Sequence, residues 1–220
     1  MSLELFAHPF SSYCQKVLTA LWENDTPFAY RHMEDPGVGD ELVARWPIGK
    51  FPVLIDDGRT VLETSIIIEH LDRFHPGPVR FLPTDPDAAL EVRLLDRFFD
   101  QYVMNAAQIA VNEAIRKMRG QADRLEEAKT TTAQALEVAY GWLEQRLSGR
   151  TWAAGHAFSM ADCAAAPSLF YADWVHPIGE DYPQLRGYRT RLLARPSFAR
   201  CVEEARRYRH YFPLGAPDRD

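Results

Sequence analysis

Residues 3–24 read LELFAHPFSSYCQKVLTALWEN and show how the chain begins to fold. The first five residues of this stretch are typical of a short strand, which the His8-Pro9 pair ends. Four apolar residues follow at the i, i+3, i+4 and i+7 positions that share one face of a helix. They are Cys14, Val17, Leu18 and Leu21. The stretch therefore predicts a strand, a tight turn and a helix.

Strand-like and helix-like stretches continue to alternate up to about residue 77. The expected strands cover residues 28–33, 52–55 and 60–62, and the expected helices cover 40–46 and 66–74. The residues DDGR at 56–59 lie between the last two strands, as in a β-hairpin. The order β-α-β-α-β-β-α predicts a small α/β domain in which a hairpin closes the sheet and helices cover its faces.

The strand signals stop after a proline-rich connector, and the rest of the chain has helical patterns. The expected helices cover residues 87–117, 123–146, 160–174, 183–194 and 197–209. Ser159 and Asp162 have the spacing of a capping box, in which a hydroxyl cap precedes an acidic residue by three positions. The sequence thus predicts an N-terminal α/β domain at residues 1–78, a linker at 79–87 and an all-α C-terminal domain at 88–220.

Composition argues against several classes of protein. The chain has 25 Lys and Arg against 31 Asp and Glu, so its net charge of −6 argues against nucleic-acid binding. It has no apolar run near the roughly 20 residues that cross a bilayer, and its first residues lack the pattern of a secretion signal. Three cysteines without a CxxC pair and seven histidines without HxH or HxxxH spacing predict neither disulfides nor a metal site. We expect a soluble, cytoplasmic protein without membrane or nucleic-acid partners.

Three polar segments carry the candidate chemistry, and each admits two interpretations. The first is PFSSYCQK at residues 9–16, in which Ser11 precedes Cys14 by three positions. Ser11 therefore holds the first position of a Cys-x-x-Cys pattern. Its hydroxyl either donates a hydrogen bond to the thiolate of a bound ligand or simply caps the following helix.

The other two segments follow at intervals along the α/β domain. In GKFPVL at residues 49–54, the bond before Pro52 is either an ordinary trans bond or a cis turn that offers backbone groups to a peptide ligand. In LETSI at residues 62–66, hydroxyl groups stand at the start of a helix. They either cap this helix or bind the carboxylate of a ligand. Glu63, just ahead of this helix, can accept a hydrogen bond from an ammonium group.

The order and spacing of these segments resemble those of the glutathione S-transferase family. A fourth segment, FSMAD at residues 158–162, resembles the family's folding box, so the resemblance spans essentially the whole chain. It implies a thioredoxin-like N-terminal domain followed by an all-α domain, in a soluble, bacterial-like member of the family. It also implies a homodimer that takes glutathione as a co-substrate and has no tightly bound cofactor.

The resemblance further implies roles for individual residues in holding glutathione. Glu63 and Thr64 would bind the amino and carboxylate groups of the γ-glutamyl part. Phe51, before a cis Pro52, would pair its backbone with the cysteinyl part. Lys50 would reach the carboxylate of the glycine.

The resemblance places Ser11 where serine-type members carry the hydroxyl that stabilises the glutathione thiolate. Tyrosine-type members carry tyrosine at the place of Ala7, and cysteine-type members carry cysteine at position 11, so both differences favour the serine type. Ser12 and Tyr13 remain alternatives for the contact to the thiolate. Cys14 falls on the apolar face of its helix and is expected to be a buried structural thiol.

The implied reaction is attack of the glutathione thiolate on a small hydrophobic electrophile, as in detoxification. Alternatives are a glutathione-dependent isomerase, dehalogenase or peroxidase, and a non-catalytic glutathione-binding or interaction module. The residues expected to line the pocket for the second substrate are aromatic or Met residues, which are also common in a core. They are Phe10, Tyr102, Met104 and Trp174. In a homodimer, Asp100 is a further candidate contact to the glutathione of the other subunit.

Overall fold

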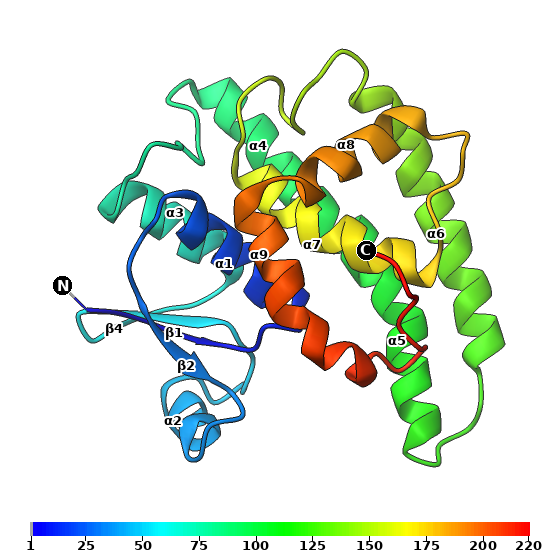
Figure 1. Cartoon of the computed structure of the whole chain (residues 1–220), viewed down its shortest axis with the longest axis horizontal. Helices are drawn as coiled ribbons and strands as arrows, with labels where there is room; N and C mark the ends of the chain where they lie inside the picture. Colours follow the sequence, from blue (N-terminus) through cyan, green and yellow to red (C-terminus); the bar gives the residue numbers. More distant parts are fainter. Residues whose placement is uncertain (1) are drawn as a thin grey trace.

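The computed structural model describes residues 2–220, and Met1, which the predicted 1–78 domain includes, lies outside the described residues. Figure 1 shows a sheet with its helices in blue and cyan beside a larger helical part coloured from green to red. All named strands of the described chain precede residue 62, and helices make up the regular structure after it. The predicted fold class, an α/β unit followed by an all-α unit, is confirmed.

The strands of residues 2–220 form one mixed sheet in the order β2-β1-β3-β4. They are β1 (Leu3–Ala7), β2 (Ala29–His32), β3 (Val53–Asp56) and β4 (Arg59–Val61). β1 runs parallel to β2 and antiparallel to β3, and β3 and β4 form the predicted hairpin. Asp57 and Gly58 make its turn with φ values of 46° and 87°, in the left-handed region that such tight turns use.

Alternation along the central strands explains why helices cover both faces of this sheet. Successive side chains of a strand point to opposite faces, so Leu5 joins the large core cluster whereas Phe6 joins a smaller one. The helices α1 (Ser12–Glu23) and α3 (Thr64–Phe74) contribute apolar residues to the large cluster. The short helix α2 (Val38–Arg45) closes the smaller cluster on the other face.

The helical part is built around α7, whose residues are almost all buried. The elements are α4 (Pro86–Phe98), η1 (Phe99–Met104), α5 (Asn105–Met118), α6 (Leu125–Arg146), α7 (Met160–Val175), α8 (Pro183–Leu193), α9 (Pro196–Ala205) and η2 (Arg206–Tyr211). Two predictions were wrong in detail. The expected helix 87–117 is interrupted by η1, a π-helical segment, and the expected helix 197–209 gives way at Arg206 to a 3-10 helix. The spacing of apolar residues does not reveal where the hydrogen-bond pattern changes from i→i+4 to i→i+5 or i→i+3.

The predicted capping box at the start of α7 is confirmed. Asp162 is fully buried, and its carboxylate accepts hydrogen bonds from the Ser159 N–H at 2.8 Å, the Ala153 N–H at 2.8 Å and the Tyr188 hydroxyl at 2.6 Å. Burial raises the pKa of Asp162, and these hydrogen bonds oppose that rise. One carboxylate thereby fixes the start of α7, the preceding loop and α8.

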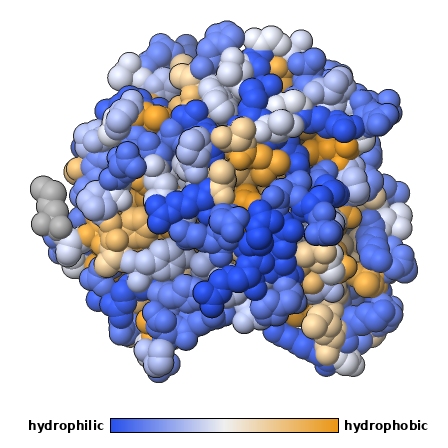
Figure 2. All heavy atoms as spheres, viewed as in Figure 1, coloured by the Kyte–Doolittle hydropathy of each residue, from blue (hydrophilic) through white to orange (hydrophobic). Residues whose placement is uncertain are grey.

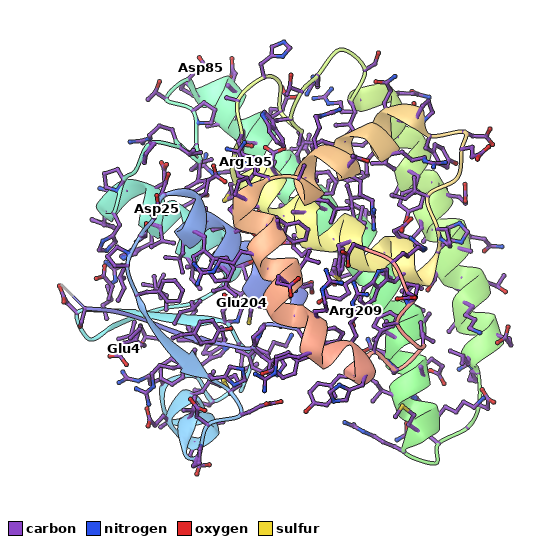
Figure 3. All side chains as sticks on the ribbon, in the orientation of Figure 1. Glu4, Asp25, Asp85, Arg195, Glu204 and Arg209 are labelled. Atoms are coloured by element: carbon purple, nitrogen blue, oxygen red, sulfur yellow. The ribbon has the colours of Figure 1, made fainter. Side chains whose placement is uncertain are left out.

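Charged side chains join the two parts of the molecule along α1. Arg195, labelled in Figure 3 just ahead of α9, donates from Nε to Glu23 at the end of α1 at 2.9 Å. Lys16 in the middle of α1 is only 1% exposed, and its Nζ lies 2.7 Å from Asp96 Oδ1 and 2.6 Å from Asp100 Oδ2. A buried ammonium group is stable only with such partners, so these contacts help to fix the helical part against the sheet.

The surface of the described residues is largely polar on the face shown in Figure 2. Within residues 2–220, no helix has both the length and the apolar character needed to cross a bilayer. Figure 2 shows hydrophilic residues over most of the face in view, with separate hydrophobic patches between them. The same view shows an indentation at the lower edge, between the lobe that holds α2 and the lower ends of α5 and α6.

Candidate functional site

A cavity of about 470 Å³ lies where the α/β part meets η1 and α5. All five residues expected to bind glutathione line it: Lys50, Phe51, Pro52, Glu63 and Thr64. Further lining residues are Tyr13, Trp46, Ser65, Ile66, Arg97, Asp100, Gln101 and Asn105. We call this space the first cavity. It brings the second and third polar segments of the sequence together on one wall.

Backbone geometry presents polar groups to the first cavity from two directions. The peptide bond between Phe51 and Pro52 is cis, as the resemblance implied, and it precedes β3. Glu63 has φ 66° and ψ 125°, a conformation that is unfavourable for a residue with a side chain and is typical of functional sites. α3 then begins at Thr64, and the first N–H groups of a helix have no partner within it. The wall is therefore suited to an anionic group beside the Glu63 carboxylate.

A second cavity of about 540 Å³ adjoins the first. The two cavities share Tyr13, Lys50 and Asn105 in their linings, and Ser11 and Ser12 line only the second. Other lining residues are Phe10, Met104, Ala107, Gln108, Val111, Asn112, Ile115, Tyr171, Val175, Tyr211, Phe212 and Pro213. The turn that carries Ser11 thus lies at the passage from a polar cavity to a more apolar one.

Ser11 caps α1, which was one of the two interpretations of its segment. Its Oγ accepts a hydrogen bond from the Cys14 N–H at 3.3 Å, and its own N–H donates to the His8 carbonyl at 3.0 Å. A hydroxyl has two acceptor lone pairs and one hydrogen to donate, so the cap does not exclude donation to a ligand. Cys14 is fully buried, as predicted, and burial raises the pKa of its thiol to about 12 despite hydrogen bonds to Ser11 and His8.

The alternatives to Ser11 have different surroundings. Ser12 is buried at the start of α1. The Tyr13 hydroxyl donates to Asn105 Oδ1 at 3.2 Å. Burial, together with the negative charges of Asp100 and Glu63, raises the pKa of Tyr13 to about 12, so this phenol stays protonated at neutral pH. Its hydrogen is already used within the protein.

The structure brings together only part of the predicted pocket for the second substrate. Phe10 and Met104 line the second cavity. Trp174 is buried behind it, with its ring centroid 6.5 Å from that of Phe10. Tyr102 is 59% exposed and lines a separate groove, because its position in η1 turns it toward α6. Residues 211–213 form a cavity wall that was not predicted from sequence. No local sequence pattern indicates a contact between the two ends of the chain.

That separate groove is strongly apolar and has a volume of about 770 Å³. It runs between the segment α4-η1-α5 and α6. Its lining residues are Phe98, Gln101, Tyr102, Asn105, Ala106, Ile109, Ala135, Val138, Ala139 and Trp142. Several of these are well exposed, including Tyr102 at 59% and Val138 at 76%. Exposed apolar grooves of this kind mark interaction surfaces.

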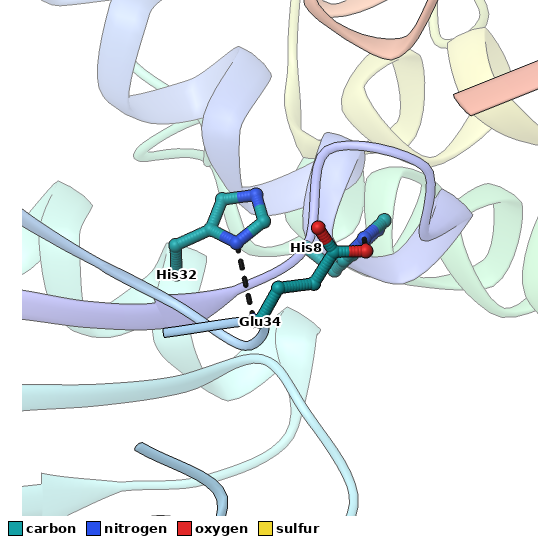
Figure 4. Close-up of side chains that lie close together, drawn as sticks. All are labelled: His8, His32 and Glu34. Carbon is teal, nitrogen blue, oxygen red and sulfur yellow. Dashed lines mark hydrogen bonds and ion pairs between the residues drawn. The ribbon is translucent and has the colours of Figure 1, made fainter. Parts of the chain in front are cut away.

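A polar cluster behind the Ser11 turn is drawn in Figure 4. His8 Nδ1 accepts from the Phe10 N–H at 3.1 Å, so its Nε2 carries the hydrogen that bonds Glu34 Oε1 at 3.2 Å. His32 Nδ1 accepts from the Glu34 N–H at 3.2 Å. Burial lowers the pKa of His8, so this ring is neutral at pH 7. The cluster ties the turn after β1 to the chain that follows β2.

Known proteins share both the sequence pattern and this arrangement. Two family models match the chain, "Glutathione S-transferase, N-terminal domain" at residues 5–79 and "Glutathione S-transferase, C-terminal domain" at residues 99–196. FtsZ-localized protein A of Caulobacter vibrioides is 29% identical over 208 residues, which are 90% of each chain. Glutathione S-transferase U27 of Arabidopsis thaliana is 28% identical, over 88% of this chain and 85% of its own.

A solved structure has the same fold. The glutathione S-transferase of Methylobacillus flagellatus KT, crystallised with glutathione bound, superposes with a TM-score of 0.76 at 27% identity. The match covers 91% of this chain and 98% of that one. Both parts of the fold are therefore shared with this structure.

Proposed function

Because the chain belongs to the glutathione S-transferase family, we propose that it is a serine-type glutathione transferase. It binds glutathione in the first cavity and lowers the pKa of the bound thiol. The thiolate then attacks a small hydrophobic electrophile held in the second cavity. The observation that carries this proposal is that five residues from separate segments line one cavity, beside the turn that presents Ser11.

Each end of glutathione has complementary groups in the first cavity. The Glu63 carboxylate accepts from the ammonium of the γ-glutamyl part, and the Thr64 hydroxyl and the start of α3 bind its carboxylate. The backbone of Phe51 pairs with the cysteinyl part, and Lys50 neutralises the glycine carboxylate. The cysteinyl sulfur then lies near Tyr13, where the two cavities meet, within reach of the Ser11 hydroxyl.

The electrophile lies against Phe10 and Met104, next to the wall formed by residues 211–213. The apolar part of this lining favours a hydrophobic substrate. We propose conjugation as the reaction and detoxification in the cytoplasm as its setting. Isomerisation, dehalogenation and peroxide reduction use the same thiolate, and a panel of electrophiles and peroxides separates them.

The binding step is tested with Glu63→Gln. We expect the substitution to weaken glutathione binding about tenfold, because it removes the charge from a hydrogen bond to the ammonium group. Titration calorimetry with glutathione measures the effect. Glu126→Gln, which changes an exposed glutamate of α6, is the matched control and should leave affinity unchanged. Equal affinities for wild type and Glu63→Gln would place the ammonium group elsewhere.

A second candidate function is a non-catalytic module that binds glutathione or another protein. The name of FtsZ-localized protein A favours this possibility, because that protein matches 90% of this chain. The two candidates differ in turnover. A protein that binds glutathione but conjugates no electrophile of the panel supports the module, whereas conjugation that depends on Ser11 supports the enzyme.

We also propose that the protein is a homodimer in which the apolar groove is covered by the second copy. Val138→Glu places a charge in the groove and should shift the protein from dimer to monomer, because burying an unpaired carboxylate is unfavourable. Sedimentation velocity measures the change. Val43→Glu is the control, since Val43 is also exposed but lies on α2. A wild type that is monomeric at micromolar concentration would contradict the proposal.

A further inference from the structure

Two histidines and one aspartate converge at the end of the sheet that lies away from Ser11. Asp56 ends β3 and pairs with Leu3 at the start of β1, whereas the Ser11 turn follows the end of β1. His70 lies in α3, and His75 caps its C-terminal end. The Nε2 atoms of both histidines lie 2.8 Å from the same oxygen, Oδ2 of Asp56.

These three side chains are largely but not completely shielded from water. Their exposed fractions are 14% for Asp56, 7% for His70 and 14% for His75. The three potential ligand atoms all lie within 4.8 Å of one another. Histidine spacing along the sequence gave no sign of this cluster, because four residues lie between His70 and His75 and Asp56 comes from a strand.

The tautomers available to the two histidines distinguish this cluster from the one in Figure 4. Nδ1 of His8 and Nδ1 of His32 each accept a backbone N–H, so their Nε2 atoms carry hydrogens and have no free lone pair. Within residues 2–220, no backbone N–H donates to Nδ1 of His70 or to Nδ1 of His75. Without a metal, each Nε2–H donates to the Asp56 carboxylate. When a cation replaces these hydrogens, each ring can carry its hydrogen on Nδ1 and bind the cation through the Nε2 lone pair.

We propose that Asp56, His70 and His75 form a binding site for Zn²⁺ or a similar divalent transition metal. Two imidazole nitrogens and one carboxylate oxygen suit this class of metal, and water completes the coordination. Metal–ligand distances of about 2.0–2.2 Å in a tetrahedral site imply ligand atoms roughly 3.3 Å apart. The 2.8 Å contacts therefore need to widen by only about 0.5 Å, which small side-chain rotations supply.

The role of this metal is to stabilise the fold, because the site contacts neither cavity. It joins the end of β3 to the C-terminal end of α3, the helix whose first residues line the first cavity. The three cysteines are all buried and do not compete for the metal. The site is thus a clamp between the sheet and α3.

The test uses the full chain without a histidine tag, after dialysis against a chelator. Calorimetry with ZnCl₂ should give one equivalent of tight binding. CoCl₂ should produce the intense visible absorption of a tetrahedral ion. Zn²⁺ at 100 times its Kd should raise the unfolding midpoint by roughly 5 °C or more.

Two variants assign the binding to this cluster. His75→Gln keeps a side chain that can donate to Asp56 but removes an imidazole, and it should weaken Zn²⁺ binding by roughly tenfold or more. Glu34→Gln alters the cluster of Figure 4 and should leave Zn²⁺ affinity unchanged. Asp56→Asn is the substitute if His75→Gln does not fold. The proposal is overturned if the wild type binds no equivalent of Zn²⁺, or if Glu34→Gln loses binding while His75→Gln keeps it.

Discussion

Replacing Ser11 by alanine is expected to lower kcat/KM for conjugation roughly 10- to 100-fold, while glutathione affinity changes little. A free thiol with a pKa of about 8.5 is only a few per cent ionised at pH 7, and lowering that pKa by about two units takes roughly 2.7 kcal/mol. One hydroxyl that donates to a charged sulfur supplies about 1.5–3 kcal/mol. The start of α1 adds about 0.3–1 kcal/mol. Loss of the hydroxyl therefore removes most of the activation.

The pH dependence of the rate gives the most specific measurement of this effect. Without the Ser11 hydroxyl, the pKa of the bound thiol rises, and less of it is ionised at pH 7. The acid limb of the kcat profile should move to higher pH, and the variant should approach the wild-type rate in alkaline solution. A fall in rate that is equal at every pH would show that the substitution disturbs the α1 cap rather than the thiolate.

Tyr13→Phe and Ser12→Ala are the matched controls. The Tyr13 hydroxyl already donates to Asn105, and Ser12 is buried at the start of α1, so both variants should keep the acid limb of the wild type. A shift of the limb in Tyr13→Phe but not in Ser11→Ala would make the tyrosine the donor. Ser11 would then serve only as the helix cap.

Local patterns were sufficient to predict most of the fold. The strands and helices of residues 3–74 follow from apolar alternation, helical spacing and turn residues, each of which is encoded within about ten positions. The order of the strands in the sheet, β2-β1-β3-β4, was not among the predictions. The π-helical segment η1 was not predicted either, because one extra residue in a turn leaves no mark in composition.

The candidate site was predicted only in part, because only some of its residues lie in local sequence motifs. Lys50, Phe51, Glu63 and Thr64 lie in short motifs, and the fold brings those motifs to one cavity. The second cavity depends on contacts between distant segments, and Tyr102 was assigned to it although its side chain lies in another groove. Helical spacing shows which apolar residues share one face of a helix, but it does not show which of two cavities that face lines.

Replacing Lys16 by methionine is expected to destabilise the protein by about 3–5 kcal/mol at pH 7, the usual cost of removing one partner from a buried ion pair. The Lys16 ammonium forms ion pairs with Asp96 and Asp100 at 2.7 and 2.6 Å, and it also donates to Ser65 at 3.1 Å. Methionine fills a similar volume, so the loss reflects charge rather than a cavity. Urea unfolding followed by circular dichroism measures the change.

The pH dependence of that loss tests its cause. Burial already raises the pKa of Asp100, and Lys16 opposes the rise, so the pKa should increase further in Lys16→Met. A carboxyl group whose pKa is raised by folding stabilises the native state while protonated, and this contribution disappears as the pH rises through the native pKa. The deficit should therefore shrink as the pH falls from 7 toward about 4.

A second substitution separates charge from packing. In Lys16→Met/Asp100→Asn, the Asp100 carboxylate that has lost its Lys16 partner is replaced by a neutral amide of the same shape, so part of the lost stability should return at pH 7. Asp87→Asn in place of Asp100→Asn is the control, because Asp87 is an exposed residue in the first turn of α4. A deficit that changes with neither the pH nor the Asp100 substitution would instead assign the loss to packing of the buried aliphatic stem of Lys16.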